Sequence, residues 1–224
     1  MISYMRILNN MDIIISLVVL VYSAILHEVS HGYVADRFGD PTARLQGRLT
    51  LDPRPHIDTF SSILLPILLL MSGSPILIGA AKPVPVDPFN LRDGRKDMAL
   101  VALSGPLTNI LLAVAASLLI RLLFSTPASH VVSPFFFSLL YPILSTIMNI
   151  NLLLAIFNLL PIPPLDGSKV FALLLPEKEA SAYLSMGSIG FFILIFLLLF
   201  PIGGFSLSHF IYTLLSSTQQ FLLP

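Results

Sequence analysis

The two histidines of the sequence His27-Glu28-Val29-Ser30-His31 are spaced for binding one metal ion. On an α-helix, residues four apart lie about 40° apart around the axis and one turn above each other, so both imidazoles can face the same ion. Glu28 projects beside them and can hold a water molecule, which is the arrangement of HExxH metalloproteases. Because the chain has no cysteine, any metal must be held by histidine and carboxylate. The pattern favours zinc, and the alternative is a hydrogen-bonded structural cluster.

A catalytic zinc site needs a third protein ligand and one open position. Asp166 is the best candidate, because the stretch from Leu122 to Leu165 before it holds no other charged residue. The three prolines between Asn158 and Asp166 forbid a continuing helix, and Gly167 allows the chain to turn the carboxylate back toward its neighbours. Asp166 is therefore predicted to complete a site of two histidines and one carboxylate. The alternative is an exposed N-cap of a helix over 168–175.

Two asparagines and a third histidine are weaker candidates for roles in the same site. Asn158 or Asn109 could donate a hydrogen bond to an oxyanion, and the sequence favours Asn158. Asn109 has the alternative of bridging two helices within a membrane. His56 could be a fourth donor or a solvated residue at the membrane interface.

The composition places these residues in a membrane. Of the 224 residues, 55% are hydrophobic and 11% are charged, with a mean hydropathy of +0.89, so a soluble catalytic domain is excluded. The formal net charge is zero, which argues against nucleic acid as a partner. The sequence predicts a single membrane-embedded domain over residues 1–224.

The apolar stretches predict an all-α polytopic protein. Because a crossing takes about 20 residues, we expect five to six transmembrane helices, with candidate ranges 11–38, 98–121, 135–160, 184–201 and 205–222. His27 then lies inside the hydrocarbon region, nearer one face. An ionisable cluster at that depth costs several kcal/mol unless it is paired or metal-bound, so it marks a functional site.

The stretch from Thr59 to Ala81 is broken by prolines and glycines and has basic flanks. If it does not cross, most lysines and arginines share one side of the membrane, as the positive-inside rule requires. Moreover, His27 and Asp166 can meet only if an even number of crossings separates them. We therefore predict a re-entrant or β-hairpin-like segment at 60–81, with the active site and the C-terminus on the cytoplasmic side.

The residues Lys82, Pro83, Val84, Pro85 and Val86 predict an extended edge that could bind a peptide by strand addition, since alternating prolines prevent a helix. The alternative is a plain loop. A substrate in helical form has its carbonyl groups hydrogen-bonded, so a transmembrane segment must be held extended before it is cut.

Three motifs together resemble the site-2 protease family of intramembrane zinc metalloproteases. They are the HExxH motif, Ser104-Gly105-Pro106-Leu107-x-Asn109, and Asn158-x-x-Pro-x-Pro-x-x-Asp-Gly. The chain is most similar to the compact branch without an inserted PDZ or CBS domain, which is also marked by stretches such as 39–43 and 79–86. One departure is Ala80, where relatives often have an aromatic residue.

The resemblance implies one zinc ion per chain, with His27, His31 and Asp166 as ligands. It implies that Glu28 is the catalytic acid and base, with a zinc-activated water as nucleophile, and that Asn158 lies near the scissile carbonyl. The expected substrates are single-span membrane proteins or signal-peptide remnants, cut in or near their transmembrane segments in the cell (inner) membrane. The alternatives are a catalytically silent adaptor that captures transmembrane segments and, less favoured, a metal or proton transporter.

Overall fold

The structure, a computed structural model, describes residues 10–58, 82–124 and 134–223. Within these ranges every regular element is a helix, and a single isolated bridge pairs Ile202 with Phe205. The predicted all-α class is confirmed. The predicted re-entrant or hairpin segment at 60–81 lies outside the described residues.

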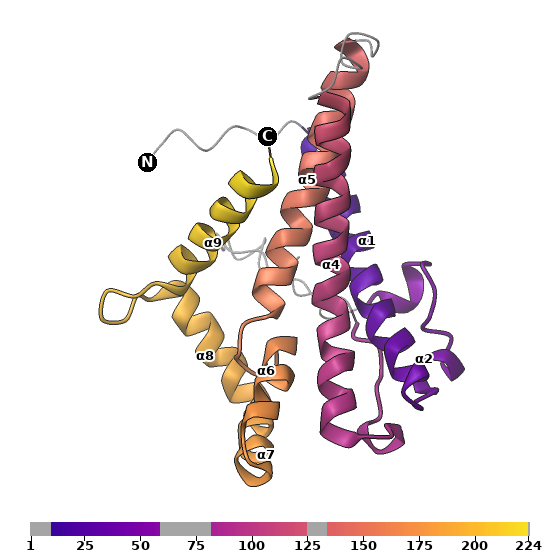
Figure 1. The fold of residues 1–224 in the computed structure, drawn as a ribbon, viewed down its shortest axis with the longest axis vertical. Helices are drawn as coiled ribbons and strands as arrows, with labels where there is room; N and C mark the ends of the chain where they lie inside the picture. The colour runs from indigo at the N-terminus through magenta and orange to yellow at the C-terminus, as the bar shows by residue number, and fades with distance from the viewer. Residues whose placement is uncertain (1–9, 59–81, 125–133, 224) are drawn as a thin grey trace.

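Three long helices form the centre of the molecule: α1 (Asn10–Arg37), α4 (Gly94–Phe124) and α5 (Pro134–Asn158). The helix α4 packs against both α1 and α5 (Figure 1). All three are long and apolar enough to cross a membrane. Their bounds agree with the first three predicted ranges to within a few residues.

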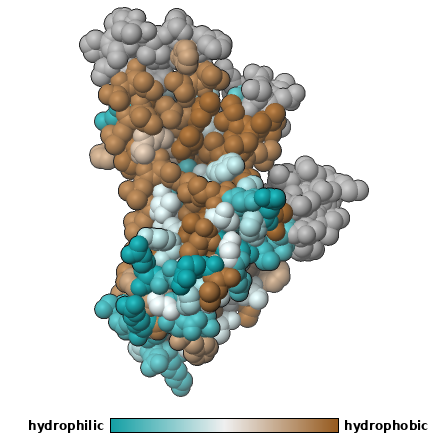
Figure 2. All heavy atoms as spheres, turned by 90° about the vertical axis from the view of Figure 1, so that its right-hand side faces the viewer, coloured by the Kyte–Doolittle hydropathy of each residue, from teal (hydrophilic) through white to brown (hydrophobic). Residues whose placement is uncertain are grey.

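The distribution of side chains on α4 explains why these helices associate. Small residues, Ala113 and Ala116, are buried against Met148 and Leu152 of α5, whereas Leu111 and Leu118 point outward. This is the pattern expected where lipid surrounds a bundle and small residues bring the helices together. Figure 2 shows apolar side chains covering the upper part of the molecule and polar side chains gathered at the lower end, where α4 begins.

Six short helices in the described part of the chain lie at this polar end. Those that precede α4 are α2 (Thr42–Leu45), η1 (Arg54–His56) and η3 (Pro88–Asn90). Those that follow α5 are α6 (Asp166–Phe171), η5 (Ala172–Leu174) and α7 (Glu177–Ser185).

An extended segment, residues 82–87, leads into η3. Its first amide, Lys82 N–H, donates to the carbonyl of His56 at 2.8 Å. The Arg48 guanidinium donates to the carbonyls of Lys82 and Pro83 at 2.8 and 3.2 Å. The segment is thus fixed by hydrogen bonds at Lys82 and Pro83, but it forms no β-ladder with any other described residue.

The last two helices, α8 (Gly187–Leu199) and α9 (Leu207–Leu222), are shorter than the predicted crossings. They have 13 and 16 residues, and α8 is bent by 67° from α7. The described residues therefore contain three helices that can cross, or four if α7 and α8 count as one broken span. This is fewer than the five to six crossings predicted for the whole chain, because neither α8 nor α9 reaches about 20 residues.

The direction of α9 corrects the predicted position of the C-terminus. Leu207, at its start, packs with Leu160 just beyond α5. At its end, the Arg121 guanidinium near the end of α4 donates to the carbonyls of Phe221 and Leu222, both at 2.9 Å. The C-terminus thus lies at the end of the bundle opposite α6 and α7 (Figure 1), not on the side of α6 and α7, where it was predicted.

Candidate metal centre

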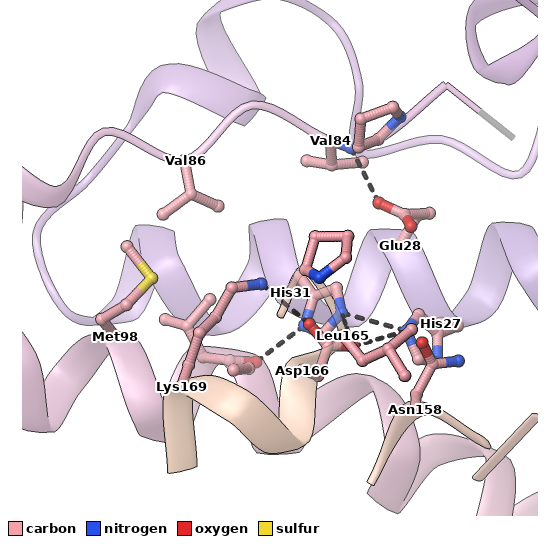
Figure 3. A pocket seen from close by; sticks show the side chains of 14 residues that line it. His27, Glu28, His31, Val84, Val86, Met98, Asn158, Leu165, Asp166 and Lys169 are labelled. Carbon is pink, nitrogen blue, oxygen red and sulfur yellow. Dashed lines mark hydrogen bonds and ion pairs between the residues drawn. The ribbon is translucent and has the colours of Figure 1, made fainter. Parts of the chain in front are cut away.

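Three buried side chains from two distant parts of the chain converge on one point. His27 and His31 project from α1, and Asp166 is the first residue of α6. His27 Nε2, His31 Nε2 and Asp166 Oδ2 lie 3.1 Å from one another in all three pairs (Figure 3). The structure therefore brings together the three ligands expected from the sequence, and it does not leave Asp166 as an exposed N-cap.

The other ring nitrogens of the histidines face oxygen acceptors. His31 Nδ1–H donates to the carbonyl of Val101 at 2.7 Å, and His27 Nδ1 lies 2.5 Å from Asn109 Oδ1. A histidine protonated at Nδ1 carries its lone pair at Nε2, the atom that points to Asp166. Metal-binding histidines in proteins are held in this way by a second hydrogen bond.

This arrangement fits zinc. Ligand atoms placed about 2.0–2.2 Å from a tetrahedral zinc lie about 3.3–3.6 Å from one another, close to the spacing found here. Three lone-pair acceptors so close together repel each other unless a cation or a proton lies between them. Two neutral imidazoles and one carboxylate are also the donor set of hydrolytic zinc sites. His27, His31 and Asp166 are thus the residues that would hold the ion.

The close approach of α1 to α4 depends on Gly105. A Cβ atom at this position would lie 2.6 Å from His27 Nε2 and 2.6 Å from His31 Cε1. Any side chain there would occupy the space of both imidazoles. Because Val101 and Asn109, the partners of the two Nδ1 atoms, lie four residues before and after Gly105, one face of α4 positions both histidines.

The carboxylate is positioned by the turn after α5. A Cβ atom on Gly167 would lie 2.2 Å from the carbonyl oxygen of Leu159, so only glycine fits this turn. Lys169, one turn further along α6, donates from Nζ to Asp166 Oδ1 at 2.9 Å. One carboxylate oxygen is therefore held by Lys169, while the other faces the histidines.

A cavity of about 360 Å³ opens beside the three ligands. Glu28 lines it next to His27, and Glu28 Oε2 accepts a hydrogen bond from Val84 N–H at 2.8 Å (Figure 3). The cavity walls come from α1, residues 83–86, the start of α4, the end of α5 and α6. The lining residues are His27, Glu28, His31, Pro83, Val84, Val86, Met98, Val101, Ala102, Asn158, Pro164, Leu165, Asp166 and Lys169.

The remaining sequence candidates divide into two groups. Asn158 lines the cavity at the end of α5, with its Nδ2 donating to the carbonyl of Leu154 at 3.0 Å. Pro83, Val84 and Val86 also line the cavity, whereas Lys82 and Pro85 of the same segment are not among its lining residues.

Asn109 and His56 lie away from the cavity. Asn109 has no exposed surface and contacts His27 from behind, which differs from the substrate-binding position expected from the sequence. His56 is buried in the polar end, where its Nε2 donates to the carbonyl of Thr50 at 2.9 Å and its Nδ1 has no hydrogen-bond partner among the described residues.

Two residues near the site were not singled out in the sequence. Lys169 follows Asp166 by three residues, a spacing that places both on one face of α6. Asn151 is fully buried in α5, where its Oδ1 accepts from Asn109 Nδ2 at 2.7 Å. An amide in the middle of an apolar stretch is a signal that could have found it.

Comparisons with known proteins agree with this geometry. Residues 130–201, which include Asn158 and Asp166, match the model of peptidase family M50. The chain is 35% identical over 190 residues to "Putative zinc metalloprotease YwhC" of Bacillus subtilis, covering 85% of this chain and 82% of the relative.

Two further relatives carry similar names. "Putative zinc metalloprotease Rip2" of Mycobacterium tuberculosis (strain H37Rv) is 35% identical over 176 residues, with 79% of this chain and 62% of the relative covered. "Putative zinc metalloprotease MJ0611" of Methanocaldococcus jannaschii is 35% identical over 157 residues, with 70% of this chain and 69% of the relative covered. No solved structure matches the chain. The chain belongs to peptidase family M50, the site-2 protease family, and is a zinc metalloprotease that apolar helices embed in a membrane.

Proposed function

We propose that this protein is an endopeptidase that hydrolyses peptide bonds in or near the transmembrane segments of single-span proteins, including signal-peptide remnants. The observation that carries the proposal is the convergence of His27, His31 and Asp166 beside Glu28 on one cavity wall, next to helices that can cross a membrane. The basic residues at this end of the bundle support a cytoplasmic orientation of the site in the cell membrane.

The roles of the site residues follow from their positions. Zinc, when bound by the three ligands, supplies a Lewis acid that makes hydroxide available near neutral pH and polarises the scissile carbonyl. Glu28 takes the proton of the attacking water and returns it to the leaving amine, because it is the carboxylate beside the ligands that is not itself one of them. The hydrogen bond from Val84 N–H holds Glu28 in place for both transfers.

Asn158 and Lys169 are placed to act on the substrate and on Asp166, respectively. Asn158 lies on the cavity wall near His27 (Figure 3), where its amide can donate to the oxygen of the scissile carbonyl as negative charge develops there. Lys169 neutralises Asp166 Oδ1 and so favours one oxygen of the carboxylate as the ligand.

The extended segment 82–87 offers a place for an unwound substrate. In an extended chain the N–H and carbonyl of one residue point to one side, and those of the next residue point to the other side. The N–H of Val84 faces Glu28. The carbonyl of Val84 and the N–H of Val86 therefore face the same side as Glu28. The prolines at 83 and 85 lack their N–H groups on the other side, where no substrate would pair. A substrate strand would therefore bind through Val84 and Val86.

A catalytically silent adaptor would need the same cavity but not Glu28 beside the ligands.

Purified protein in liposomes should be given a single-span protein and a soluble protein that contains the same cleavable sequence without a membrane segment. We expect cleavage of the first within or near its membrane segment and little cleavage of the second. Equal cleavage of both would contradict the proposed substrate class, and binding of the first without cleavage would favour the adaptor.

A further inference from the structure

A chain of buried hydrogen bonds extends from the candidate metal centre through α4 and α5. His27 Nδ1 contacts Asn109 Oδ1, and Asn109 Nδ2 donates to Asn151 Oδ1 at 2.7 Å. Asn151 Nδ2 then donates to Ser23 Oγ at 2.9 Å and to the carbonyl of Ile147 at 2.8 Å. Both asparagines have no exposed surface, so water cannot replace any of these partners.

The backbone carbonyl of Ile147 sets the direction of the whole chain, because a carbonyl can only accept a hydrogen bond. The NH₂ group of Asn151 must therefore face Ile147, and its Oδ1 must face Asn109. The NH₂ group of Asn109 must then face Asn151, which turns Asn109 Oδ1 toward His27. This oxygen can only accept, so His27 must carry its proton at Nδ1.

We infer that Asn151 and Asn109 form an amide relay that fixes the tautomer of His27 and keeps the Nε2 lone pair directed at the metal. Both are positioning residues, and Asn151 acts through two intervening hydrogen bonds without touching the site. The inference rests on the proposed role of His27 as a zinc ligand. It assigns Asn109 to the metal centre and not to the substrate.

A purely structural role would be to bridge helices, since buried amides often do so in membrane bundles. The same helix offers a matched control. Asn149, two residues before Asn151, accepts from Gln219 Nε2 of α9 at 2.9 Å. It also bridges two helices through its amide, but no chain of hydrogen bonds within the described part of the protein connects it to His27. Replacing Asn149 removes a bridge to α9, whereas replacing Asn151 removes bridges to α1 and α4 and is the change that interrupts the relay.

The test compares the zinc affinity of the full chain in detergent, measured by competition with a chromophoric chelator, for wild type, Asn151→Ala, Asn109→Ala and Asn149→Ala. Loss of a hydrogen-bond partner behind a metal ligand weakens metal binding about 10–100-fold, so we expect this loss for Asn151→Ala and Asn109→Ala. Asn149→Ala should bind zinc like the wild type. Thermal unfolding of each variant shows that the comparison is made on folded protein, and Asn151→Ser is the second variant if Asn151→Ala does not fold.

A spectroscopic measurement without metal tests the tautomer itself. With ¹⁵N-labelled histidine, His27 of the metal-free wild type and of Asn149→Ala should be protonated at Nδ1, and Asn151→Ala should show a mixture of tautomers. Equal zinc affinity and equal His27 spectra for Asn151→Ala and Asn149→Ala would overturn the relay while leaving the metal site in place. Unchanged zinc affinity in His27→Ala would instead overturn the proposed metal site.

Discussion

Gly105 shows how a residue without a side chain can control the metal centre. The space that its Cβ would need is filled by the imidazoles of His27 and His31. We predict that Gly105→Ala displaces both rings, weakens zinc binding at least about tenfold, as disruption of ligand positioning does in other sites, and lowers cleavage accordingly.

A matched control for this prediction is Gly187→Ala at the start of α8, where an added Cβ would meet no atom within 4 Å. Zinc content after dialysis and the rate of cleavage should be measured for both variants. Gly187→Ala should behave like the wild type. A Gly105→Ala variant with full zinc content and full activity would mean that the two histidines do not need their present positions.

Residue types and spacing were enough to find most of the candidate site. The HExxH spacing predicts that His27 and His31 share a helix face, and the lone aspartate after a proline-rich break predicts the third member. Asn151 and the position of Asn109 could not be derived in this way. Both depend on how α1, α4 and α5 are rotated against one another, which side-chain packing decides and sequence spacing does not.

Asp40 connects residues from two described parts of the loop between α1 and α4. Its buried carboxylate accepts hydrogen bonds from Thr42, from Asn90 Nδ2 at 3.0 Å and from Asp87 N–H at 2.7 Å. Burial raises the pKa of Asp40, but these hydrogen bonds, led by that of the Thr42 side chain, together lower it below its ordinary value. Because Asp87 ends the extended segment 82–87, Asp40 fixes that segment beside the cavity.

The lowered pKa has a defined effect on stability. A carboxyl group whose pKa is lower in the folded state stabilises the protein fully above the unfolded-state pKa of about 3.9 and loses this contribution as the pH falls through the folded-state value. We predict that Asp40→Asn costs about 1–3 kcal/mol at pH 7 and makes stability less dependent on pH below about 5.

Thermal unfolding in detergent between about pH 3 and 7 measures this dependence, with Asp93→Asn as the control. Asp93 is largely exposed and pairs only with Lys96 among the described salt bridges. A wild-type protein and an Asp40→Asn variant with parallel pH profiles would show that the titration of Asp40 contributes nothing to the pH dependence of stability.

The segment 82–87 leads to a prediction about substrate binding. If a substrate pairs with the N–H of Val86, then Val86→Pro should raise the KM for a single-span substrate and leave zinc content unchanged. Loss of one backbone hydrogen bond of this kind is worth about 0.5–1.5 kcal/mol, or about a twofold to tenfold change. Pro85→Ala, which restores an N–H on the opposite side, is the control, and an equal effect of both changes would argue against strand pairing here.

The helices themselves were predictable where they are long and apolar. The ranges 11–38, 98–121 and 135–160 correspond to α1, α4 and α5 because length and hydropathy decide whether a segment crosses. The same rule counted α8 and α9 as two crossings. The sequence does not reveal that α9 leads on toward the end of the bundle opposite α7 after the turn at Gly203 and Gly204, where both glycines adopt positive φ (Figure 1).

In the whole molecule, α8 and α9 lead from α7 to the opposite end of the bundle, so the C-terminus lies away from the metal centre (Figure 1). A single cysteine introduced in turn at Lys178 of α7 and after Pro224 can be labelled with a membrane-impermeant maleimide, because the chain has no cysteine of its own. We predict that the two positions are labelled from opposite sides of the membrane. Labelling from the same side would contradict the direction of α9 and support a final full crossing.

The central claim is that one zinc ion held by His27, His31 and Asp166 works with Glu28 to hydrolyse peptide bonds. The most direct measurement is zinc content together with cleavage of a single-span substrate in liposomes for wild type, Glu28→Gln, Asp166→Ala and the exposed control Asp93→Ala. We predict full zinc and a loss of at least about 10²–10⁴-fold in rate for Glu28→Gln, loss of both zinc and activity for Asp166→Ala, and wild-type behaviour for Asp93→Ala. Full zinc in Asp166→Ala, or undiminished cleavage by Glu28→Gln, would contradict the account.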